Sequence, residues 1–360
     1  MTDHFRFHYP AIEEEELDVF NVRKPPFRIH GLFEPQTPGM FRRMPQNIAE
    51  NTSKRVRLLH TNTAGARLRF ATDSDYLAVG AVYPTMEFPS ARTAAFAGAG
   101  AFCFDLYVDG KHQRVLWPET LVQRGSVMSF DIPDGQYEAS VSFYEKKLRQ
   151  ITLCFPSFVN ISDVFVGIRK GAMLESGQEY RNRKPVVFYG SSITQGACAS
   201  HSGNLYQNIL SRKLNFDYIN LGFASGAKAE DSIIDYLCGL EMSILVFDYD
   251  HNAKSPEFLE STHLPALRKL RCAHPDIPFI LLSKPNRHAG ESDAYQRISI
   301  IEASFRALQK DGNGPVHFIN GQEIFLSHDP EMMTIDGTHP TDIGFYCIAE
   351  ALEQVIRQHI

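Results

Sequence analysis

The spacing of hydrophobic and polar residues divides the chain into two parts with different periodicities. From about residue 54 to residue 170, short segments alternate apolar and polar residues and are rich in aromatic and β-branched side chains, as half-buried β-strands are. Turn-forming residues such as Asp109 and Gly110 separate these segments. Many short strands without intervening helices predict a jelly-roll-like β-sandwich. The predicted strands are 67–70, 76–79, 104–108, 138–143 and 150–155.

After about residue 180, expected strands and helices alternate. This alternation predicts a parallel sheet with helices on both faces, which is a three-layer, doubly wound α/β fold. Ligands bind such sheets at the carboxyl ends of the strands, so we expect the chemistry in the loops that follow them. The expected strands are 185–189, 218–221, 243–248, 278–283 and 317–319, and the expected helices are 205–214, 256–272, 292–310 and 342–357.

The change of periodicity predicts two domains, which a length of 360 residues readily accommodates. The polar stretch 179–184 marks the boundary, so we assign residues 1–178 to the sandwich and residues 179–360 to the α/β domain. The first 50 residues contain several prolines and no clear periodicity. A segment that wraps around the sandwich is one arrangement that they allow.

Composition places the chain among ordinary globular proteins, since 43% of its residues are hydrophobic and 22% are charged. The formal net charge of −6 argues against binding to nucleic acid or to an anionic membrane, which requires clustered Lys and Arg. No apolar stretch approaches the roughly 20 residues of a transmembrane helix. We therefore expect neither nucleic acid nor a membrane among its partners.

The first residues lack the basic and apolar regions of a secretory signal. The six cysteines are scattered without a C-x-x-C pair, and most have apolar neighbours, which is typical of reduced, buried thiols. A cytoplasmic enzyme is the simplest interpretation, with export by a non-standard route left open.

The loop after the first strand of the α/β domain contains a candidate nucleophile. Residues 190–196 read G-S-S-I-T-Q-G, a G-x-S-x-T-x-G pattern. Glycines on both sides allow a sharp turn that would present the hydroxyl of Ser192 at the edge of the sheet. A plain strand-to-helix loop of small residues would have a similar sequence, so this motif alone does not decide between the two.

A candidate base lies just before the last helix, in the sequence I-D-G-T-H-P of residues 335–340. A serine hydroxyl attacks well only when a base takes its proton, and His is the usual base near neutral pH. Asp336 stands three residues before His339, where it can orient the imidazole within one loop. The structural alternative is an Asx-turn in which Asp336 accepts local backbone N–H groups.

Two further loops offer donors for an oxyanion, the negatively charged oxygen that forms during acyl transfer. Asn252 follows the third strand of the α/β domain, and residues 221–226, L-G-F-A-S-G, follow the second. Each loop alone is more often structural. Together the four loops carry Ser, Gly, Asn and Asp/His in chain order, which is hard to obtain by accident.

On these motifs the chain resembles the SGNH (GDSL-like) hydrolase superfamily, whose name lists four such residue types. It resembles most a subgroup in which a β-sandwich with a G-x-D-L-Y signature precedes the hydrolase domain, similar to carbohydrate acetyl esterases. The resemblance spans nearly all of the chain beyond the first 40 or so residues. The matching stretches are 189–196, 248–253, 336–342 and, for the signature, 104–107.

The resemblance implies a role for each matching residue. It makes Ser192 the nucleophile, His339 the base and Asp336 its orienting partner. It also implies an oxyanion hole formed by the N–H of Ser192, the side chain of Asn252 and the N–H of Gly226, with Gly222 as the alternative glycine.

Three residues depart from the family pattern. Ser191 replaces the Asp of the G-D-S form, and Cys103 stands where the leading signature has Gly. The oxyanion glycine lies in the sequence Ala224-Ser225-Gly226, where related sequences usually read Ser-Gly-Ser. Gly226 is thus displaced by one position from the glycine that it should match.

The resemblance implies hydrolysis of short-chain esters, above all acetyl esters of carbohydrates, without a cofactor. The substrate would be a small-molecule or oligosaccharide ester, and the sequence leaves open whether the chain forms a homo-oligomer. An acyltransferase that uses the same residues is one alternative. A catalytically silent carbohydrate-binding protein is the other.

Two other features could suggest different chemistry. Asp248, Asp250 and His251 could bind a metal, but alternate residues of an extended stretch face opposite ways, so we expect no metal and favour a hydrogen-bonded brace of the loop. Cys198 follows Ser192 by six residues without a glycine-bracketed turn, so we expect it to pack rather than to react.

Overall fold

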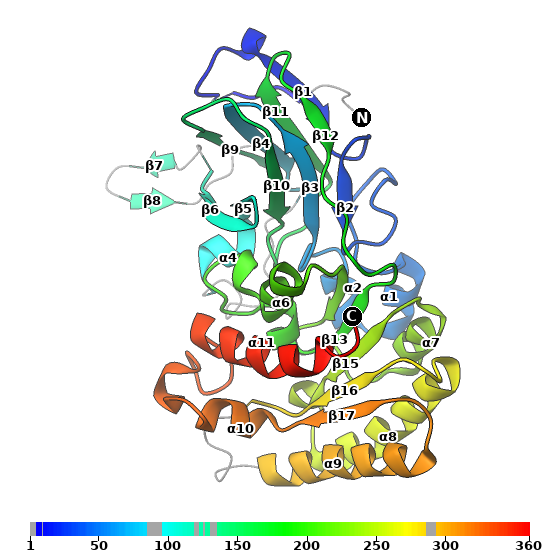
Figure 1. Ribbon diagram of the computed structural model, residues 1–360. Coiled ribbons are helices and arrows are strands. Elements are labelled where there is room, and N and C mark those ends of the chain that lie inside the picture. Colours follow the sequence, from blue (N-terminus) through cyan, green and yellow to red (C-terminus); the bar gives the residue numbers. More distant parts are fainter. Residues whose placement is uncertain are drawn as a thin grey trace. The chain divides into compact units, whose positions relative to one another are not determined.

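The computed structural model describes residues 5–8, 10–84, 96–118, 122–124, 127–129, 135–285 and 293–360 (Figure 1). The chain folds into two compact units. Unit 1 comprises Met1–Arg42, Thr61–Glu179 and His201–Gly203, and unit 2 comprises Arg43–His60, Tyr180–Ser200 and Asn204–Ile360.

Unit 1 contains two large antiparallel sheets, as predicted for a β-sandwich. All five predicted strands form, but residues 54–59 form a helix, and two strands that the sequence did not predict lie before residue 54. The first sheet has the order β1 (Leu17–Asn21), β11 (Asp163–Arg169), β4 (Tyr76–Val82), β9 (Gln136–Ser142). The second has the order β12 (Leu174–Ser176), β3 (Arg67–Thr72), β10 (Arg149–Cys154), β5 (Phe104–Val108), β6 (Lys111–Leu116), with β2 (Arg28–His30) also paired to β3. Shorter elements are η1 (Glu14–Glu16), α4 (Gly98–Phe102), β7 (Val122–Arg124) and β8 (Val127–Ser129).

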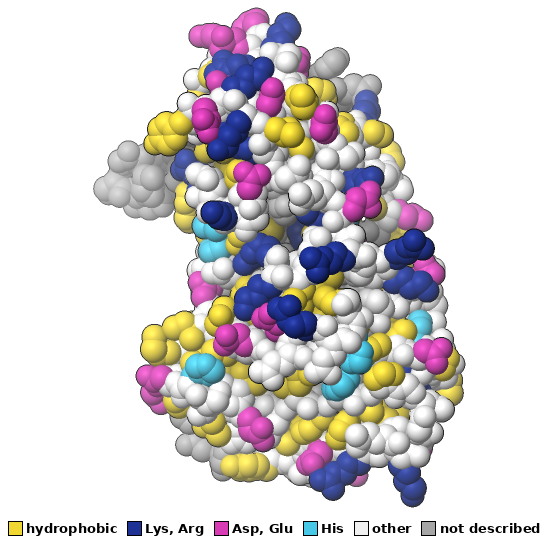
Figure 2. All heavy atoms as spheres, in the orientation of Figure 1, with side chains coloured by type: hydrophobic (Ala, Val, Ile, Leu, Met, Phe, Trp, Pro, Cys, Tyr) yellow, Lys and Arg dark blue, Asp and Glu magenta, His cyan; other side chains and the backbone are white. Residues whose placement is uncertain are grey.

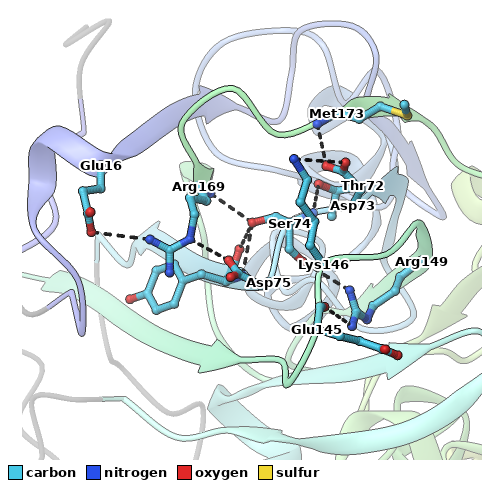
Figure 3. Close-up of polar contacts among 11 residues, drawn as sticks. Glu16, Thr72, Asp73, Ser74, Asp75, Glu145, Lys146, Arg149, Arg169 and Met173 are labelled. Atoms are coloured by element: carbon cyan, nitrogen blue, oxygen red, sulfur yellow. Dashed lines mark hydrogen bonds and ion pairs between the residues drawn. The ribbon is translucent and has the colours of Figure 1, made fainter.

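The turn between β3 and β4 carries the chain from one sheet of unit 1 to the other, and polar contacts hold it in place (Figure 3). The hydroxyl of Ser74 donates to the carbonyl of Tyr76 over 2.6 Å and accepts the N–H of Arg169 at 3.0 Å. The guanidinium Nε of Arg169 donates to Asp75 Oδ1 over 2.6 Å. These side chains satisfy backbone and charged groups at a point where the strand ladders are interrupted.

Unit 2 is built on a five-stranded parallel sheet. Its order is β14 (Tyr218–Gly222), β13 (Val186–Gly190), β15 (Ile244–Asp248), β16 (Phe279–Leu282), β17 (Val316–Ile319). The first strand of this sheet, β13, therefore lies between the second and the third. In doubly wound sheets, ligands bind at the point where the strand order reverses in this way, which here lies between β13 and β15.

Helices cover both faces of this sheet, so the predicted doubly wound fold is confirmed (Figure 1). Alternate residues of each strand face opposite helix layers. Phe188 of β13 packs in a cluster with Leu210 and Phe345, whereas the neighbouring Tyr189 stacks on Phe247. The helices are α5 (Ser192–Gln195), α6 (Tyr206–Leu214), α7 (Asp231–Gly239), α8 (Pro256–Ala273), α9 (Ala294–Asp311), α10 (Gly321–Leu326) and α11 (Asp342–Ile356), with short 3-10 turns η4 (Asp250–Asn252) and η6 (Pro330–Met332). A further 3-10 turn, η3 (Ser202–Asn204), begins in the unit 1 segment His201–Gly203.

Residues 43–60 fold with unit 2, although the sequence interpretation assigned them to the first domain. They form α1 (Gln46–Thr52) and α2 (Lys54–Leu59), the second of which Ser53 caps by accepting the N–H of Val56. Arg43 holds this segment in unit 2. Its guanidinium is buried and donates to the carbonyls of Asn220, Gly222 and Leu59 at 2.9, 2.7 and 2.8 Å. A sequence pattern does not reveal such a contact between distant segments.

Among the helices that lie within the described ranges, none combines the length and the apolar character needed to cross a bilayer. On the face drawn in Figure 2, Lys and Arg side chains are interspersed with Asp and Glu.

The buried guanidinium of Arg43 leads to a prediction for stability. Burial lowers the pKa of Arg43 to about 9, so the group remains charged at neutral pH. Arg43→Met would leave three buried carbonyl oxygens without their donor, and we expect the free energy of unfolding to fall by about 3 kcal/mol. Denaturant unfolding measures this change. The control Arg57→Met removes an exposed guanidinium from α2 and should change stability by about 0.5 kcal/mol or less; equal effects of the two substitutions would contradict the role of Arg43.

Candidate active site

Backbone contacts shape the turn between β13 and α5 and place Ser192 at its end. A Cβ at Gly190 would lie 2.2 Å from both Asp248 O and Thr194 Oγ1, so only glycine fits there. Ser191 caps α5 by accepting the N–H of Ile193 at 3.2 Å. Ser192 is the first residue of α5 and is only partly buried. Ser191 thus performs the capping that the Asp of the G-D-S form could also perform.

The loop before α11 uses both oxygens of Asp336. Oδ1 accepts the N–H groups of Thr338 and His339 at 3.1 and 2.8 Å, which is an Asx-turn. Oδ2 lies 2.8 Å from Nδ1 of the His339 ring. The loop closes on itself, since the N–H of Ile335 donates to His339 O over 3.0 Å. The two interpretations of Asp336 in the sequence are therefore compatible, because one carboxylate does both.

The structure brings Ser192, His339 and Asp336 together in one line of contacts. His339 Nε2 lies 3.0 Å from Ser192 Oγ, on the far side of the ring from Asp336. His339 is 6% exposed, so the surroundings hold its ring in this orientation. Burial alone would raise the pKa of Asp336, but the hydrogen bonds and charge of His339 outweigh it and hold that pKa below its usual value. Asp336 is thus ionised at neutral pH and can hold Nδ1–H toward itself, leaving Nε2 to accept the proton of Ser192.

Two of the predicted oxyanion donors remain available. Asn252 Nδ2 donates to Phe223 O over 3.0 Å, and because an amide nitrogen carries two hydrogens, one is left for a substrate. The N–H of Ser192 is in the first turn of α5, where a helix offers no acceptor. Within the described parts of the chain, that N–H donates no hydrogen bond to another backbone group.

The N–H groups of both predicted glycines already donate hydrogen bonds to other groups of the protein. That of Gly226 bonds to Phe223 O at 2.8 Å, and that of Gly222 bonds to Asn220 Oδ1 at 2.9 Å. Gly222 is needed for space instead, since its Cβ would lie 2.2 Å from the backbone nitrogen of Gln195. Ser225 stands where related sequences have glycine and adopts φ 58°, the left-handed conformation that glycine favours. The sequence interpretation passed over Ser225, although the one-residue displacement of Gly226 was the signal for it.

Family models describe both halves of the chain. Residues 183–357 match the GDSL-like lipase/acylhydrolase family, and residues 17–174 match the GxDLY family, the N-terminus of SGNH-hydrolase-type esterases. The chain belongs to the SGNH (GDSL-like) ester hydrolases. No curated protein sequence matches it.

Solved structures share the complete fold of this SGNH hydrolase. A GDSL-like lipase from Bacteroides ovatus is 23% identical with a TM-score of 0.77, covering 95% of this chain and 97% of the other. A salicylyl-acyltransferase from a tetracycline biosynthetic pathway is 19% identical with a TM-score of 0.72, covering 96% and 98%. A family two carbohydrate esterase from Cellvibrio japonicus is 11% identical with a TM-score of 0.60, covering 95% and 97%. At these identities the likeness shows the fold alone.

Beside Asn252, the SGNH hydrolase buries two carboxyl groups. Asp248 Oδ2 accepts the hydroxyl of Thr194 at 3.0 Å, and Asp250 Oδ2 accepts the N–H of Lys284 at 2.9 Å, so both brace the loop. The Oδ1 atoms of both Asp residues are buried and have no hydrogen-bond partner within the described part of the chain. Burial, and next the charge of Asp250, raises the pKa of Asp248 well above its usual range. Burial also raises the pKa of Asp250 to about 6.

The raised pKa of Asp250 predicts a pH-dependent effect of substitution. The folded protein binds this proton more tightly than the unfolded chain, whose carboxyl has a pKa near 3.8. Ionised Asp250 therefore costs stability, increasingly as pH rises from about 4 to 6 and fully above pH 6. Asp250→Asn removes this cost, and its amide oxygen can still accept the N–H of Lys284. We expect the variant to melt at a higher temperature than wild type at pH 8, with a smaller difference at pH 5.

Thermal unfolding at the two pH values tests this expectation. Asp276→Asn is the matched control, because it removes a carboxylate from an exposed position of the same unit. Its melting temperature should differ from that of wild type by a similar amount at both pH values. A loss of stability in Asp250→Asn that is greater at pH 8 than at pH 5 would show that ionised Asp250 is stabilising.

Proposed function

We propose that the protein hydrolyses esters by two-step acyl transfer, with Ser192 as nucleophile, His339 as general base and Asp336 as the residue that orients the imidazole. The observation that carries the proposal is the unbroken series of contacts from Ser192 Oγ to His339 Nε2, 3.0 Å, and from His339 Nδ1 to Asp336 Oδ2, 2.8 Å. This is the arrangement that activates a serine hydroxyl for attack on a carbonyl.

In the proposed reaction, one proton moves from Ser192 to His339 and then to the leaving group. His339 Nε2 takes the proton of Ser192 as Oγ bonds to the ester carbonyl carbon, and Asp336 stabilises the imidazolium that results. The imidazolium then gives its proton to the leaving alkoxide as the carbon–oxygen bond breaks. Water repeats the sequence on the acyl-enzyme, with His339 again as base, and releases the carboxylic acid.

The oxyanion is held by three donors in this proposal. The N–H of Ser192 and the free hydrogen of the Asn252 amide are two of them. For the third we propose the N–H of Ser225 in place of that of Gly226. Two observations support Ser225 over Gly226: the N–H of Gly226 already donates to Phe223 O, and Ser225 adopts a left-handed conformation. Donors fixed by backbone contacts stabilise a developing negative charge strongly, since they need no reorganisation during the reaction.

Small acyl groups are the proposed substrates, above all acetyl esters of carbohydrates. Structural neighbours include family two carbohydrate esterases from Cellvibrio japonicus and Clostridium thermocellum, the latter in complex with cellohexaose. A further neighbour is an acetyl xylan esterase from Butyrivibrio proteoclasticus. The fold that this chain shares with them supports the same substrate class without establishing it.

Replacement of the nucleophile is the direct test of the mechanism. Ser192→Ala should lower kcat for p-nitrophenyl acetate by about 10⁴-fold or more, since the base is left without a group to activate. The assay compares variants at matched folded concentration. Cys198→Ser is the control, because it removes the nearby thiol and should retain activity. Near-wild-type turnover by Ser192→Ala would overturn the assignment, and loss of activity in Cys198→Ser alone would point to a thiol nucleophile.

The proposed substrate class predicts a preference for short acyl chains. We expect kcat/KM for p-nitrophenyl acetate to exceed that for the octanoate by about tenfold or more, since a site that holds an acetyl group closely excludes longer chains. A panel of acetylated sugars then identifies the alcohol part of the ester. A preference for the octanoate would overturn the short-chain proposal without affecting the role of Ser192.

An acyltransferase is the second candidate, which the structural likeness to a salicylyl-acyltransferase favours. The acyl-enzyme is common to both reactions, and only the acceptor that attacks it differs. Product analysis with and without an added sugar or amine acceptor separates them: free acid indicates a hydrolase, and an acylated acceptor indicates a transferase. If wild type acts on no ester of the panel, the third alternative, a silent carbohydrate-binding protein, is favoured.

A further inference from the structure

The Asp of the G-x-D-L-Y signature is buried in unit 1 and has no role in the proposed hydrolysis. Asp105 lies in β5, and its side chain is 0% exposed. An ionised carboxylate at such a position is costly unless positive charge or hydrogen-bond donors compensate it. The groups that surround Asp105 therefore indicate what this position is built to hold.

Two histidines and one backbone N–H face the carboxylate of Asp105. His112 Nε2 lies 2.8 Å from Oδ1, and His201 Nδ1 lies 2.5 Å from Oδ2. The N–H of Gly203 donates to Oδ2 over 2.9 Å. The two imidazole rings stack, with centroids 4.6 Å apart and planes at 19°. One ligand atom from each of Asp105, His112 and His201 lies within 4.8 Å of the others.

The hairpin of β5 and β6 brings the first two of these residues to the same face. Asp105 and Tyr107 are two residues apart in β5, so both point to one side of the sheet. His112 pairs with Tyr107 across the hairpin and shares that side. The pairing shifts register between Leu106 and Tyr107, and such an irregularity re-aims side chains. The Asp109-Gly110 turn closes the hairpin with φ of 51° and 76°.

The third residue is fixed by a close backbone approach. A Cβ at Gly203 would lie 2.1 Å from Tyr107 Oη and 2.3 Å from Asp105 Oδ2, so residue 203 must be glycine. The segment His201–Gly203 belongs to unit 1, although its neighbours in sequence, Ser200 and Asn204, belong to unit 2. The close approach of Gly203 to Asp105 therefore brings His201, two residues earlier, near the carboxylate.

We propose that Asp105, His112 and His201 form a binding site for a divalent transition-metal ion, with zinc as the best match. Imidazole nitrogen and carboxylate oxygen are the ligands that zinc takes in proteins, whereas calcium and magnesium prefer oxygen alone. The ion would take the place of the direct contacts between the carboxylate and the two rings. It would compensate the buried charge with two positive charges.

The exposure of the two histidines and the hydrogen bond from Gly203 to the carboxylate fit a metal site. The side chain of His112 is 40% exposed and that of His201 is 16% exposed, so the buried carboxylate can be reached from solvent past the rings. Three protein ligands leave a fourth position of a tetrahedral zinc site for water. The N–H of Gly203 would continue to orient the carboxylate, as outer partners of metal ligands commonly do.

Titration of the chelator-treated, full-length protein with zinc chloride tests the proposal. Isothermal titration calorimetry should show one zinc ion per chain with a Kd of about 1 µM or below. His112→Gln should weaken this binding by about 100-fold or more. The new amide can still donate to Asp105, and residue 112 is on an exposed part of β6, so the fold is expected to persist. Circular dichroism checks that it does.

Two control variants locate the ion. His359→Gln removes one member of another close histidine pair, in which His317 Nε2 and His359 Nε2 lie 2.9 Å apart. Asp250→Asn alters the second cluster of carboxylates and histidine, Asp248, Asp250 and His251. Both variants should bind zinc as wild type does. Co²⁺ gives an independent readout, since its visible absorption intensifies in a four-coordinate site, and His112→Gln should lack that intensification.

Three outcomes would overturn the proposal. They are no binding by wild type, equal binding by wild type and His112→Gln, and loss of binding in either control variant but not in His112→Gln. In the first case the cluster would be a hydrogen-bonded triad that shares protons. Binding of zinc is measured without an ester, so the result does not depend on the proposed hydrolysis.

Discussion

The candidate active site depends on how closely three neighbouring strands of the unit 2 sheet approach one another at their carboxyl ends. Gly190 pairs with Gly222 on one side and with Asp248 on the other. A side chain at Gly190 would collide with the carbonyl of Asp248, and one at Gly222 would collide with the backbone of α5. Backbone packing therefore fixes the turn that ends at Ser192, and close-packed interiors allow little adjustment of such contacts. Because β13 and β15 meet where the strand order reverses, the loops that carry Ser192 and Asn252 begin side by side.

Buried polar groups near this turn are satisfied to different degrees. The guanidinium of Arg43 donates to three carbonyls, two of which belong to β14, so the N-terminal segment 43–60 is joined to the edge of the sheet beside the catalytic turn. Asp248 and Asp250 are each half satisfied, with one oxygen bonded and one unpartnered within the described residues. The pKa values of Asp248 and Asp250 are therefore raised, since a buried carboxyl group without enough donors is more stable when it is protonated. The loop that carries Asn252 is therefore held at some electrostatic cost, as polar groups at functional positions often are.

The sequence predicted the elements whose pattern is local and strong. The five strands of unit 2 alternate with helices and are mostly apolar, and all five were expected within about two residues. β6 was not expected, because four of its six residues are exposed and polar, which is typical of an edge strand but not of an alternating one. The helical segment 43–60 was also missed, since its place in unit 2 depends on contacts with residues almost 180 positions away. The sequence pointed to Ser192, His339 and Asp336, which the structure brings into contact, because each lies in a recognisable loop; their catalytic roles stay a prediction. The oxyanion glycine could not be predicted, because which N–H is free depends on hydrogen bonds to Asn220 and Phe223 that no motif encodes.

The Asp–His contacts of Asp336 and of Asp105 differ in geometry, and this difference explains why the two are assigned different chemistry. Asp336 contacts one imidazole and also accepts backbone N–H groups, and these hydrogen bonds lower its pKa. The opposite nitrogen of His339 faces the hydroxyl of Ser192. A proton can therefore move from Ser192 to His339 while the carboxylate stays ionised. Asp105 contacts two imidazoles, each through a single nitrogen, and these nitrogens turn toward the same carboxylate rather than toward a third group. Convergence of nitrogen and oxygen atoms on one point suits a cation, whereas a linear series of contacts suits proton transfer.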